Sequence, residues 1–322
     1  MGKSFFKKSK FILFCLFLLM FSRKHYAQFI DTLAIENIIV ADSLFDKKDY
    51  KNAILFYKKT EKRSFFPKNE IYEMISLSHY YLSEKDSALK YMVKSIDSGK
   101  HYWTENLLKG DKITLTILSH DTTEIYLQHL ESNTNKFLNS HEHVIYKKLS
   151  DSLVVRKQLD QKYRTIGKKK TRKEWKKQKD IDYENKLFLS SIIKKINSWP
   201  GYKEVGREGE SACYLFTQHS EDSIFQKKCL YLMHPAALVN NMNPSHYGYL
   251  LDRHLLITKG YQVFCTQIEM VKKGDKSIAQ LKKNNLFNRR YAKTLRSYFT
   301  MPPLQFYLDQ MTEMNNSNFF FN

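Results

Sequence analysis

A helical pattern that repeats after 35 residues constrains the first third of the chain most strongly. From Leu33 to Gly99 the apolar residues follow helical spacing, and four positions recur in the same order. The two sets are Asp49, Ala53, Ile54 and Tyr57, then Glu84, Ala88, Leu89 and Met92. Short polar turns at 46–49 and 83–86 separate the helices of each unit. Small residues such as Ala53 and Ala88 allow close helix contact, so the pattern predicts two packed helix pairs.

This spacing resembles a pair of tetratricopeptide repeats. The resemblance implies that residues 28–138 form a helical domain that binds a protein or peptide partner. Two units are fewer than such arrays normally contain, so the helical stretch from Trp103 to Leu138 is expected to complete and cap the stack.

The N-terminus has the pattern of an export signal. Four lysines in residues 1–10 precede an apolar run from Phe11 to Phe21, which is too short to cross a bilayer as an ordinary helix. Ala27, followed by Gln28, offers a cleavage site. We therefore expect residues 1–27 to be removed and the protein to be periplasmic or extracellular. If the segment were not cleaved, it would anchor the chain in the membrane, which the chain would contact only there.

The net charge of +20 would suit binding to nucleic acid, because lysine and arginine bind phosphates. The expected export argues against that partner, and the lysines are spread along the whole chain. Their densest stretch, 162–179, lies within residues 139–182, which we interpret as a polar basic linker or helix. A solvated linker is one reading of this stretch, and contact with an anionic surface is the other.

Three cysteines follow the signal segment, namely Cys213, Cys229 and Cys265. An odd and sparse set does not predict a disulfide framework, so one bridge at most is expected. Buried thiols that act as small hydrophobic residues are the favoured interpretation.

Helix signals dominate the second half of the chain. Predicted helices cover residues 183–198 and Glu208 to Met233, where Pro235 should end or kink the second one. Asn243 is the expected N-cap of a helix that stops at Gly260. Residues 261–268 alternate as a strand would, and 276–314 are predicted to be helical with a break at Pro302-Pro303. The fold class is therefore mainly α, with tetratricopeptide-like repeats followed by an α-rich module with a short β element.

Paired motif residues run through the same half. They are Asp160-Gln161 and Arg164, Trp199-Pro200, Val205-Gly206, Gln218-His219, Gln226, Asp252-Arg253, Gln262 and Thr266-Gln267. Together they resemble the bacterial domain of unknown function 6624 from near Leu153 to near Met311. The core of that domain is placed at residues 183–314, before a tail at 315–322. Trp199-Pro200 and Val205-Gly206 are interpreted as structural.

The candidate site centres on His219. On a continuous helix, His219, Asp222 and Gln226 share one face with apolar residues, and an unpaired buried polar group costs about 1–3 kcal/mol. The hypothesis is that His219 transfers a proton or binds a ligand, that Asp252 orients His219 or Arg253, and that Arg253 binds an anionic group. Gln218, Asp222 and Gln226 would bind the ligand. The other interpretation, slightly favoured by the sequence alone, is a buried polar network that only stabilises the helices.

The residues near Gln262 supply further candidates. Gln262 and Thr266 share one face of the predicted strand and Gln267 lies on the other, so their side chains would either bind a polar ligand or close a small sheet. Cys265 stands where the family commonly has glycine, in the sequence Phe264-Cys265-Thr266-Gln267. A cysteine at that position is not expected to be the family's nucleophile.

No metal or cofactor is expected. The sequence has no glycine-rich phosphate loop, and His141 and His143 are two residues apart, which does not align them on one helix face. The favoured function is an interaction or ligand-binding protein, with a helical-repeat domain for a partner and a polar or anionic small ligand. The alternative is an extracytoplasmic enzyme, such as a hydrolase, that uses His219, Asp252 and Arg253.

Overall fold

The computed structural model describes residues 30–63, 65–98, 132, 144–164, 171–274, 276–282 and 289–316. The signal segment at 1–27, most of the stretch from Trp103 to Leu138, His141 and His143, and residues 317–322 of the tail lie outside these ranges. The protein is mainly α-helical, as the sequence predicts, and the described part contains one two-stranded sheet.

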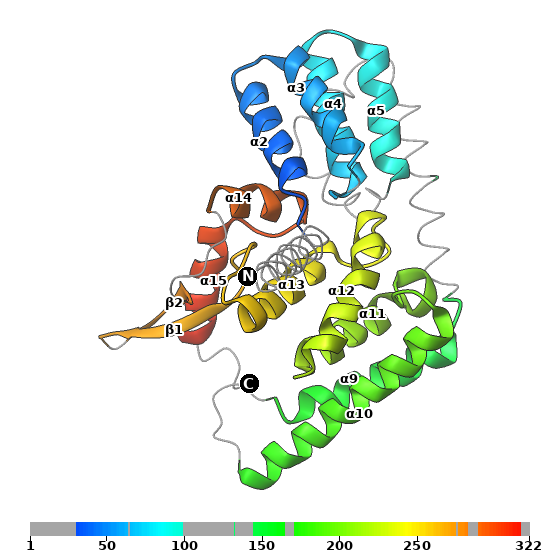
Figure 1. Cartoon of the computed structure of the whole chain (residues 1–322), viewed down its shortest axis with the longest axis vertical. Coiled ribbons are helices and arrows are strands. Elements are labelled where there is room, and N and C mark those ends of the chain that lie inside the picture. The colour runs from blue at the N-terminus through cyan, green and yellow to red at the C-terminus, as the bar shows by residue number, and fades with distance from the viewer. Residues whose placement is uncertain are drawn as a thin grey trace, which may run out of the picture.

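Four helices form the N-terminal end of the molecule, at the top of Figure 1. They are α2 (Thr32–Asp46), α3 (Tyr50–Glu61), α4 (Lys68–Tyr81) and α5 (Lys85–Asp97). The turn of each pair contains one residue with left-handed backbone, Lys48 with φ 63° and Ser83 with φ 61°. Ala53 and Ala88 are buried at close helix contacts, with 0% and 2% of their surface exposed. The two helix pairs thus have the predicted form, and their membership of the tetratricopeptide family stays a prediction.

Replacing Ala88 by leucine should lower the free energy of unfolding by about 1–3 kcal/mol, because the added carbons have no space between α4 and α5. The hydroxyl of Ser76 already lies 2.6 Å from the Ala88 carbonyl oxygen, to which it donates. Thermal or urea unfolding measures the effect, and Lys90→Leu on the exposed side of α5 is the control. Equal stability of the two variants would contradict the close helix contact.

The N-terminal helices pack on the C-terminal half through α14 (Arg289–Tyr298), which lies beside α2 in Figure 1. Asp42 of α2 accepts hydrogen bonds from the hydroxyls of Tyr57 and Tyr298, both at 2.9 Å. The rings of Phe65 and Phe66 pack edge-on or tilted against Phe299, which follows α14. A shared carboxylate and an aromatic cluster therefore join the two halves.

The C-terminal half is built from α9 (Lys147–Lys162), α10 (Arg172–Ile196), α11 (Tyr202–His219), α12 (Ser223–Leu238) and α13 (Pro244–Lys259). The green helices α9 and α10 form the end of the molecule opposite to α2–α5 (Figure 1). Residues 139–182, expected to be a linker or helix, thus contain α9 and the start of α10. One face of α9 packs on α11, where Leu153 and Asp160 are fully buried.

Gly206 kinks α11 beside the start of α9. It has φ 71° inside α11, a left-handed kink that other residues rarely adopt. A Cβ atom there would lie 3.3 Å from the side chain of Val144. Next to the kink, the Ser150 hydroxyl donates to the Val205 carbonyl oxygen at 2.6 Å. Trp199, also a motif residue, is 1% exposed, so both motifs have the structural role that the sequence suggests.

The predicted helix from Glu208 to Met233 is wrong, because the chain breaks between α11 and α12. Ser220 is extended, with ψ 130°. Asp222 then acts as N-cap of α12, accepting from the backbone N–H groups of Ile224 and Phe225 at 3.0 Å each. Pro235 does not end α12, which continues to Leu238. The caps of α13 are as predicted, with Asn243 at its start and a left-handed Gly260 at its end.

The predicted strand at 261–268 is wrong as well. The two strands are β1 (Ile268–Lys273) and β2 (Lys276–Leu281), which pair antiparallel. The prediction of continuous helix from 276 therefore fails at β2, whereas α14 and α15 (Leu304–Asn316) flank the expected break at Pro302-Pro303. Residues 262–267 form a loop because side chains, and no neighbouring strand, take most of their backbone N–H groups.

Two further observations concern helix hydrophobicity and the cysteines. Within the described ranges, no helix is both long enough and apolar enough to span a membrane. Cys213, Cys229 and Cys265 are buried, and none of them forms a disulfide in this part of the chain.

Candidate functional site

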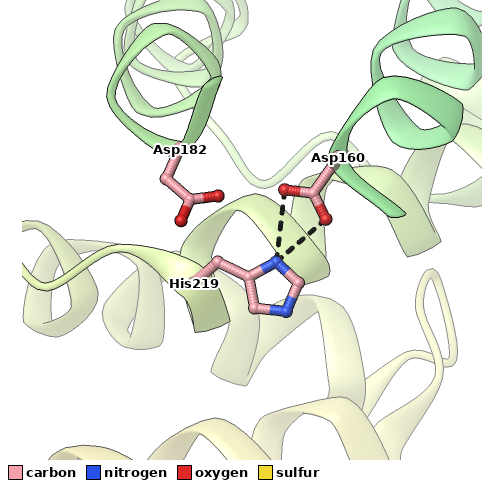
Figure 2. A group of neighbouring side chains, drawn as sticks. All are labelled: Asp160, Asp182 and His219. Carbon is pink, nitrogen blue, oxygen red and sulfur yellow. Dashed lines mark hydrogen bonds and ion pairs between the residues drawn. The ribbon is translucent and has the colours of Figure 1, made fainter. Parts of the chain in front are cut away.

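His219 and Asp160 form the centre of the site. The Nδ1 atom of His219, at the end of α11, lies 3.0 Å from Oδ2 and 3.3 Å from Oδ1 of Asp160 on α9. The Asp160 side chain is fully buried, while 13% of the His219 side chain is exposed. Figure 2 shows that the second ring nitrogen, Nε2, points away from both nearby carboxylates. Nε2 has no hydrogen-bond partner among the described residues, so it is available to a ligand.

Arg164 neutralises the carboxylates of the site. Its Nε lies 3.2 Å from Oδ2 of Asp160, one helical turn away, and its Nη2 donates to Asp182 on α10. Gln178 and Asn185, both about 1% exposed, add amide donors to Asp182 and Asp160 at 2.9 and 3.5 Å. Helices α9, α10 and α11 thus each contribute a side chain to one hydrogen-bonded network, namely Asp160, Asp182 and His219.

Burial would raise the pKa of Asp160, but the hydrogen bond to His219 and the charges of His219 and Arg164 outweigh it and lower the pKa of the carboxyl group. Asp160 therefore stays ionised at neutral pH, where it can accept a hydrogen bond from a protonated Nδ1 of His219. That contact leaves the lone pair of a neutral His219 on Nε2, the arrangement that a general base needs.

Metal binding is the competing chemistry. Asp160, Asp182 and His219 each offer one ligand atom, and these atoms lie within 4.8 Å of one another. The guanidinium of Arg164, however, already donates to both carboxylates. A divalent cation would have to displace it, so the arrangement favours proton transfer over metal binding.

A cavity of about 410 Å³ opens beside His219. Its lining residues come from α10 and the α11–α12 junction: Lys179, Asp182, Tyr183, Lys186, His219, Ser220, Glu221 and Asp222. The lining is polar and carries both signs of charge. A small polar ligand would fit this space.

Asp252 does not orient His219 or Arg253, contrary to the hypothesis. Its fully buried carboxylate accepts from the backbone N–H groups of Val263, Phe264 and Thr266 at 2.6–2.9 Å, and from the Thr266 hydroxyl at 2.9 Å. Burial raises the pKa of Asp252, and these four donors oppose that rise. The residue holds the loop that precedes β1.

Gln262 and Gln267 fasten the same loop. The Gln262 amide donates to the Gln267 carbonyl oxygen at 3.1 Å and accepts from the Gln267 N–H at 2.9 Å. Gln267 also donates to the Thr266 hydroxyl at 3.2 Å. Their hydrogen bonds therefore fit the structural alternative better than ligand binding.

The remaining candidates lie around the helix junction. Asp222 caps α12 and lies 3.4 Å from the Lys186 amine. Gln226 is 1% exposed and donates to the Ser220 carbonyl oxygen at 2.8 Å. This bond holds the α11–α12 turn, which lines the cavity. Gln218 precedes His219 on α11 and is half-buried. Arg253 is half-buried on α13, and no ion pair links it to any residue within the described ranges.

Comparison with known proteins supports the family resemblance of the C-terminal half. The model of a family of unknown function, DUF6624, matches residues 152–315, which is about half of the chain. The chain belongs to this family. The match begins on α9, so it includes Asp160, Arg164, Asp182 and His219 and leaves out the helix pairs. No curated protein and no solved structure shows significant similarity to the chain.

Within the DUF6624 domain, Cys265 has φ 59°, the left-handed region that favours glycine. The family resemblance predicts a glycine at this position. The carbonyl oxygens of Phe264 and Cys265 accept from the buried Arg296 at 2.9 and 3.4 Å. Cys265 thus lies at a point where the backbone of the loop is left-handed.

Cys265→Gly should change the free energy of unfolding by less than about 1 kcal/mol, because relief of left-handed strain, roughly 1–2 kcal/mol, offsets the lost burial of the thiol. Cys265→Val should cost about 2 kcal/mol or more, since a β-branched residue fits this conformation poorly. Urea unfolding of both variants measures the difference. A valine variant as stable as the glycine variant would contradict the left-handed backbone.

The sequence did not reveal Asp160, Arg164 or Asp182 as site residues. Asp160 and Arg164 are four residues apart and share a helix face, which is a local signal, and both belong to the family pattern. Asp182 lies in a lysine-rich helix where an aspartate is unremarkable. Only the packing of α10 beside α9 brings it to Arg164.

Proposed function

We propose that the DUF6624 domain is a catalytic module in which His219 transfers a proton to or from a small polar ligand, as in hydrolysis. The observation that carries this proposal is the 3.0 Å contact between His219 Nδ1 and the buried, ionised Asp160. It fixes the ring and its tautomer while Nε2 stays without a partner in the described structure. The 410 Å³ cavity beside His219 supplies a place for the ligand.

In a hydrolytic step, His219 Nε2 would take a proton from the attacking water and return it to the leaving group. The positive imidazolium formed in between would be stabilised by Asp160 at 3.0 Å. Arg164 donates to the second carboxylate, Asp182, and so offsets its negative charge beside the Asp160–His219 pair. Asp252 is not part of this step, because its oxygens are committed to the 263–266 loop.

A screen of the full chain against ester, amide, phosphoester and glycoside substrates tests this function. Any activity found should disappear in His219→Gln, a change that keeps the size and polarity of the side chain. The variant should keep the thermal unfolding temperature of the parent within a few degrees, since His219 is at the edge of the cavity. Full activity in this variant would remove His219 from the mechanism.

Partner binding by the helix pairs is a second proposed role. Exposed apolar side chains on α2, α3 and α4 support it, with Leu33 53%, Leu55 54% and Tyr81 45% exposed. Another part of α2 contacts α14, so a partner would use the remaining surface. Replacing Leu55 and Tyr81 by serine should weaken capture of that partner and leave the activity of the DUF6624 domain unchanged.

Export is proposed from the N-terminal pattern. Mass spectrometry of the mature protein should find a new N-terminus near Gln28, since Ala27 is the small residue that a signal peptidase would accept. An intact Met1 on protein from the membrane fraction would show that the segment is an anchor. A full-length cytoplasmic chain would contradict export.

A further inference from the structure

The two-stranded hairpin projects from the side of the molecule, and its tip lies away from the helices (Figure 1). Its strands β1 and β2 pair antiparallel, with Met270 opposite Ala279 and Lys272 opposite Ser277. A strand at the edge of a sheet has one row of backbone N–H and C=O groups that its neighbour does not reach. In a hairpin both strands are edge strands, so two such rows need partners.

Helix α15 takes the row of groups on β2. The Ser277 N–H donates to Oδ1 of Asn316 at 3.0 Å, and Nδ2 of Asn316 donates to the Ser277 carbonyl oxygen at 2.7 Å. The Ala279 N–H donates to the hydroxyl oxygen of Thr312 at 2.9 Å. Side chains of α15 thus replace the neighbouring strand that β2 lacks, and this edge of the sheet is closed.

The other edge of the sheet, on β1, is open. Ser277 and Ala279 direct their backbone groups away from β1, so their opposite residues Lys272 and Met270 direct theirs away from β2. Within the described ranges, no group outside the hairpin forms a hydrogen bond with the backbone of either residue. Met270 is 37% exposed and Lys272 is exposed as well, so another chain can reach this edge.

The base of the hairpin is held in place. The buried carboxylate of Asp252 fixes the loop before β1, and the Tyr307 hydroxyl of α15 donates to the Thr266 carbonyl oxygen at 3.0 Å. Ala279 on β2 is 5% exposed where α15 packs on the strand. An edge that is already ordered loses little conformational freedom when a further strand pairs with it, which favours binding.

The charge of the hairpin indicates the kind of partner. Over residues 268–283 the positive residues outnumber the negative ones: Lys272, Lys273, Lys276, Lys282 and Lys283 stand against Glu269 and Asp275. This excess complements an acidic segment. It also opposes pairing with the same edge of a second copy, because lysines on an edge strand disfavour self-association.

We propose that the open edge of β1 binds an extended acidic segment of a protein partner, which adds to the sheet as a third strand. The segment would exchange backbone hydrogen bonds with Met270 and Lys272, and its carboxylates would lie beside the lysines of the hairpin. This surface is separate from the cavity beside His219, so the proposal does not depend on the proposed catalytic function.

A fluorescein-labelled, end-capped peptide of alternating glutamate and valine tests this edge. Main-chain hydrogen bonds supply the affinity in this mode of binding, so a generic sequence is an adequate probe. Fluorescence anisotropy with the full chain should show saturable binding. The same peptide with lysine in place of glutamate should bind about tenfold more weakly or worse at constant ionic strength.

Amide hydrogen exchange measured by NMR locates the bound peptide without any substitution. Exchange at Met270 and Lys272 should slow when the acidic peptide is added, because their N–H groups gain acceptors. Exchange at Ser277 should stay the same, since its N–H already donates to Asn316.

Met270→Pro removes one outward N–H, and the fold should tolerate it because proline is accepted where an edge-strand N–H faces solvent. The variant should bind the acidic peptide about tenfold more weakly or worse, since proline removes a donor. Met270→Ala, which keeps the N–H, is the matched control and should bind within about threefold of the parent. Circular dichroism and thermal unfolding establish that both variants are folded.

The proposal is overturned if the acidic peptide does not bind the parent, or if it binds without slowing exchange at Met270 and Lys272. It is also overturned if a folded Met270→Pro variant binds as tightly as Met270→Ala. In that case the peptide would be attracted to the lysines alone and would not pair with the strand.

Discussion

Asp160→Asn is expected to lower kcat of the DUF6624 domain by about 10²- to 10⁴-fold, the usual contribution of general acid–base catalysis. Asparagine keeps the shape of the side chain but cannot stabilise the imidazolium of His219 through a full negative charge. His219→Gln should cost a similar factor. Because the two residues act as one unit, the double variant should be little worse than the poorer single variant.

Asp151→Asn is the matched control for this series. Asp151 also lies on α9, but its side chain is 60% exposed and pairs with Lys147 at 2.8 Å on the surface. Its removal should leave kcat and stability unchanged. An Asp160→Asn enzyme within about threefold of the parent would contradict a general acid–base role for the pair.

Asp252→Ala should lower the free energy of unfolding by about 3 kcal/mol or more. The change leaves four buried donors without their acceptor, and each unsatisfied buried group costs about 1–3 kcal/mol before relaxation. Chemical unfolding followed by circular dichroism measures the loss.

Asp309→Ala is the control for this stability effect. Asp309 is exposed on α15, where it accepts only from Gln305 at 2.8 Å among the described residues. Its removal should change stability by less than about 0.5 kcal/mol. If Asp252→Ala is as stable as Asp309→Ala, the loop does not depend on the carboxylate.

The sequence predicts most of the local structure of this chain. The 35-residue shift identifies both helix pairs down to their turns, since Lys48 and Ser83 occupy equivalent left-handed positions. Asn243 and Gly260 mark the ends of α13 correctly. These features depend on neighbours a few residues apart, which a single sequence displays directly.

The errors come from side chains that compete with regular structure. Asp222 caps α12 and so breaks a helix that the apolar spacing makes continuous. Asp252 and Gln262 take the backbone N–H groups that a strand at 261–268 would need. In both places a polar side chain replaces the backbone partner, which hydrophobic periodicity does not reveal.

The site depends on long-range contacts. Asp160 and His219 are 59 residues apart, and no spacing rule links them. The adjacent Asp252 and Arg253 are misleading as a pair, because neighbouring residues on a helix point about 100° apart. Asp252 faces the 263–266 loop, whereas Arg253 makes no ion pair within the described ranges.

The protonation of His219 is the most direct test of the account. A long-range ¹H–¹⁵N spectrum at neutral pH, assigned by comparison with His219→Gln, reports which ring nitrogen carries the proton. We predict that the neutral ring is protonated at Nδ1, facing Asp160, and that Asp160→Asn changes this signal. A ring protonated at Nε2, with a spectrum that Asp160→Asn does not alter, would contradict the Asp160–His219 pair.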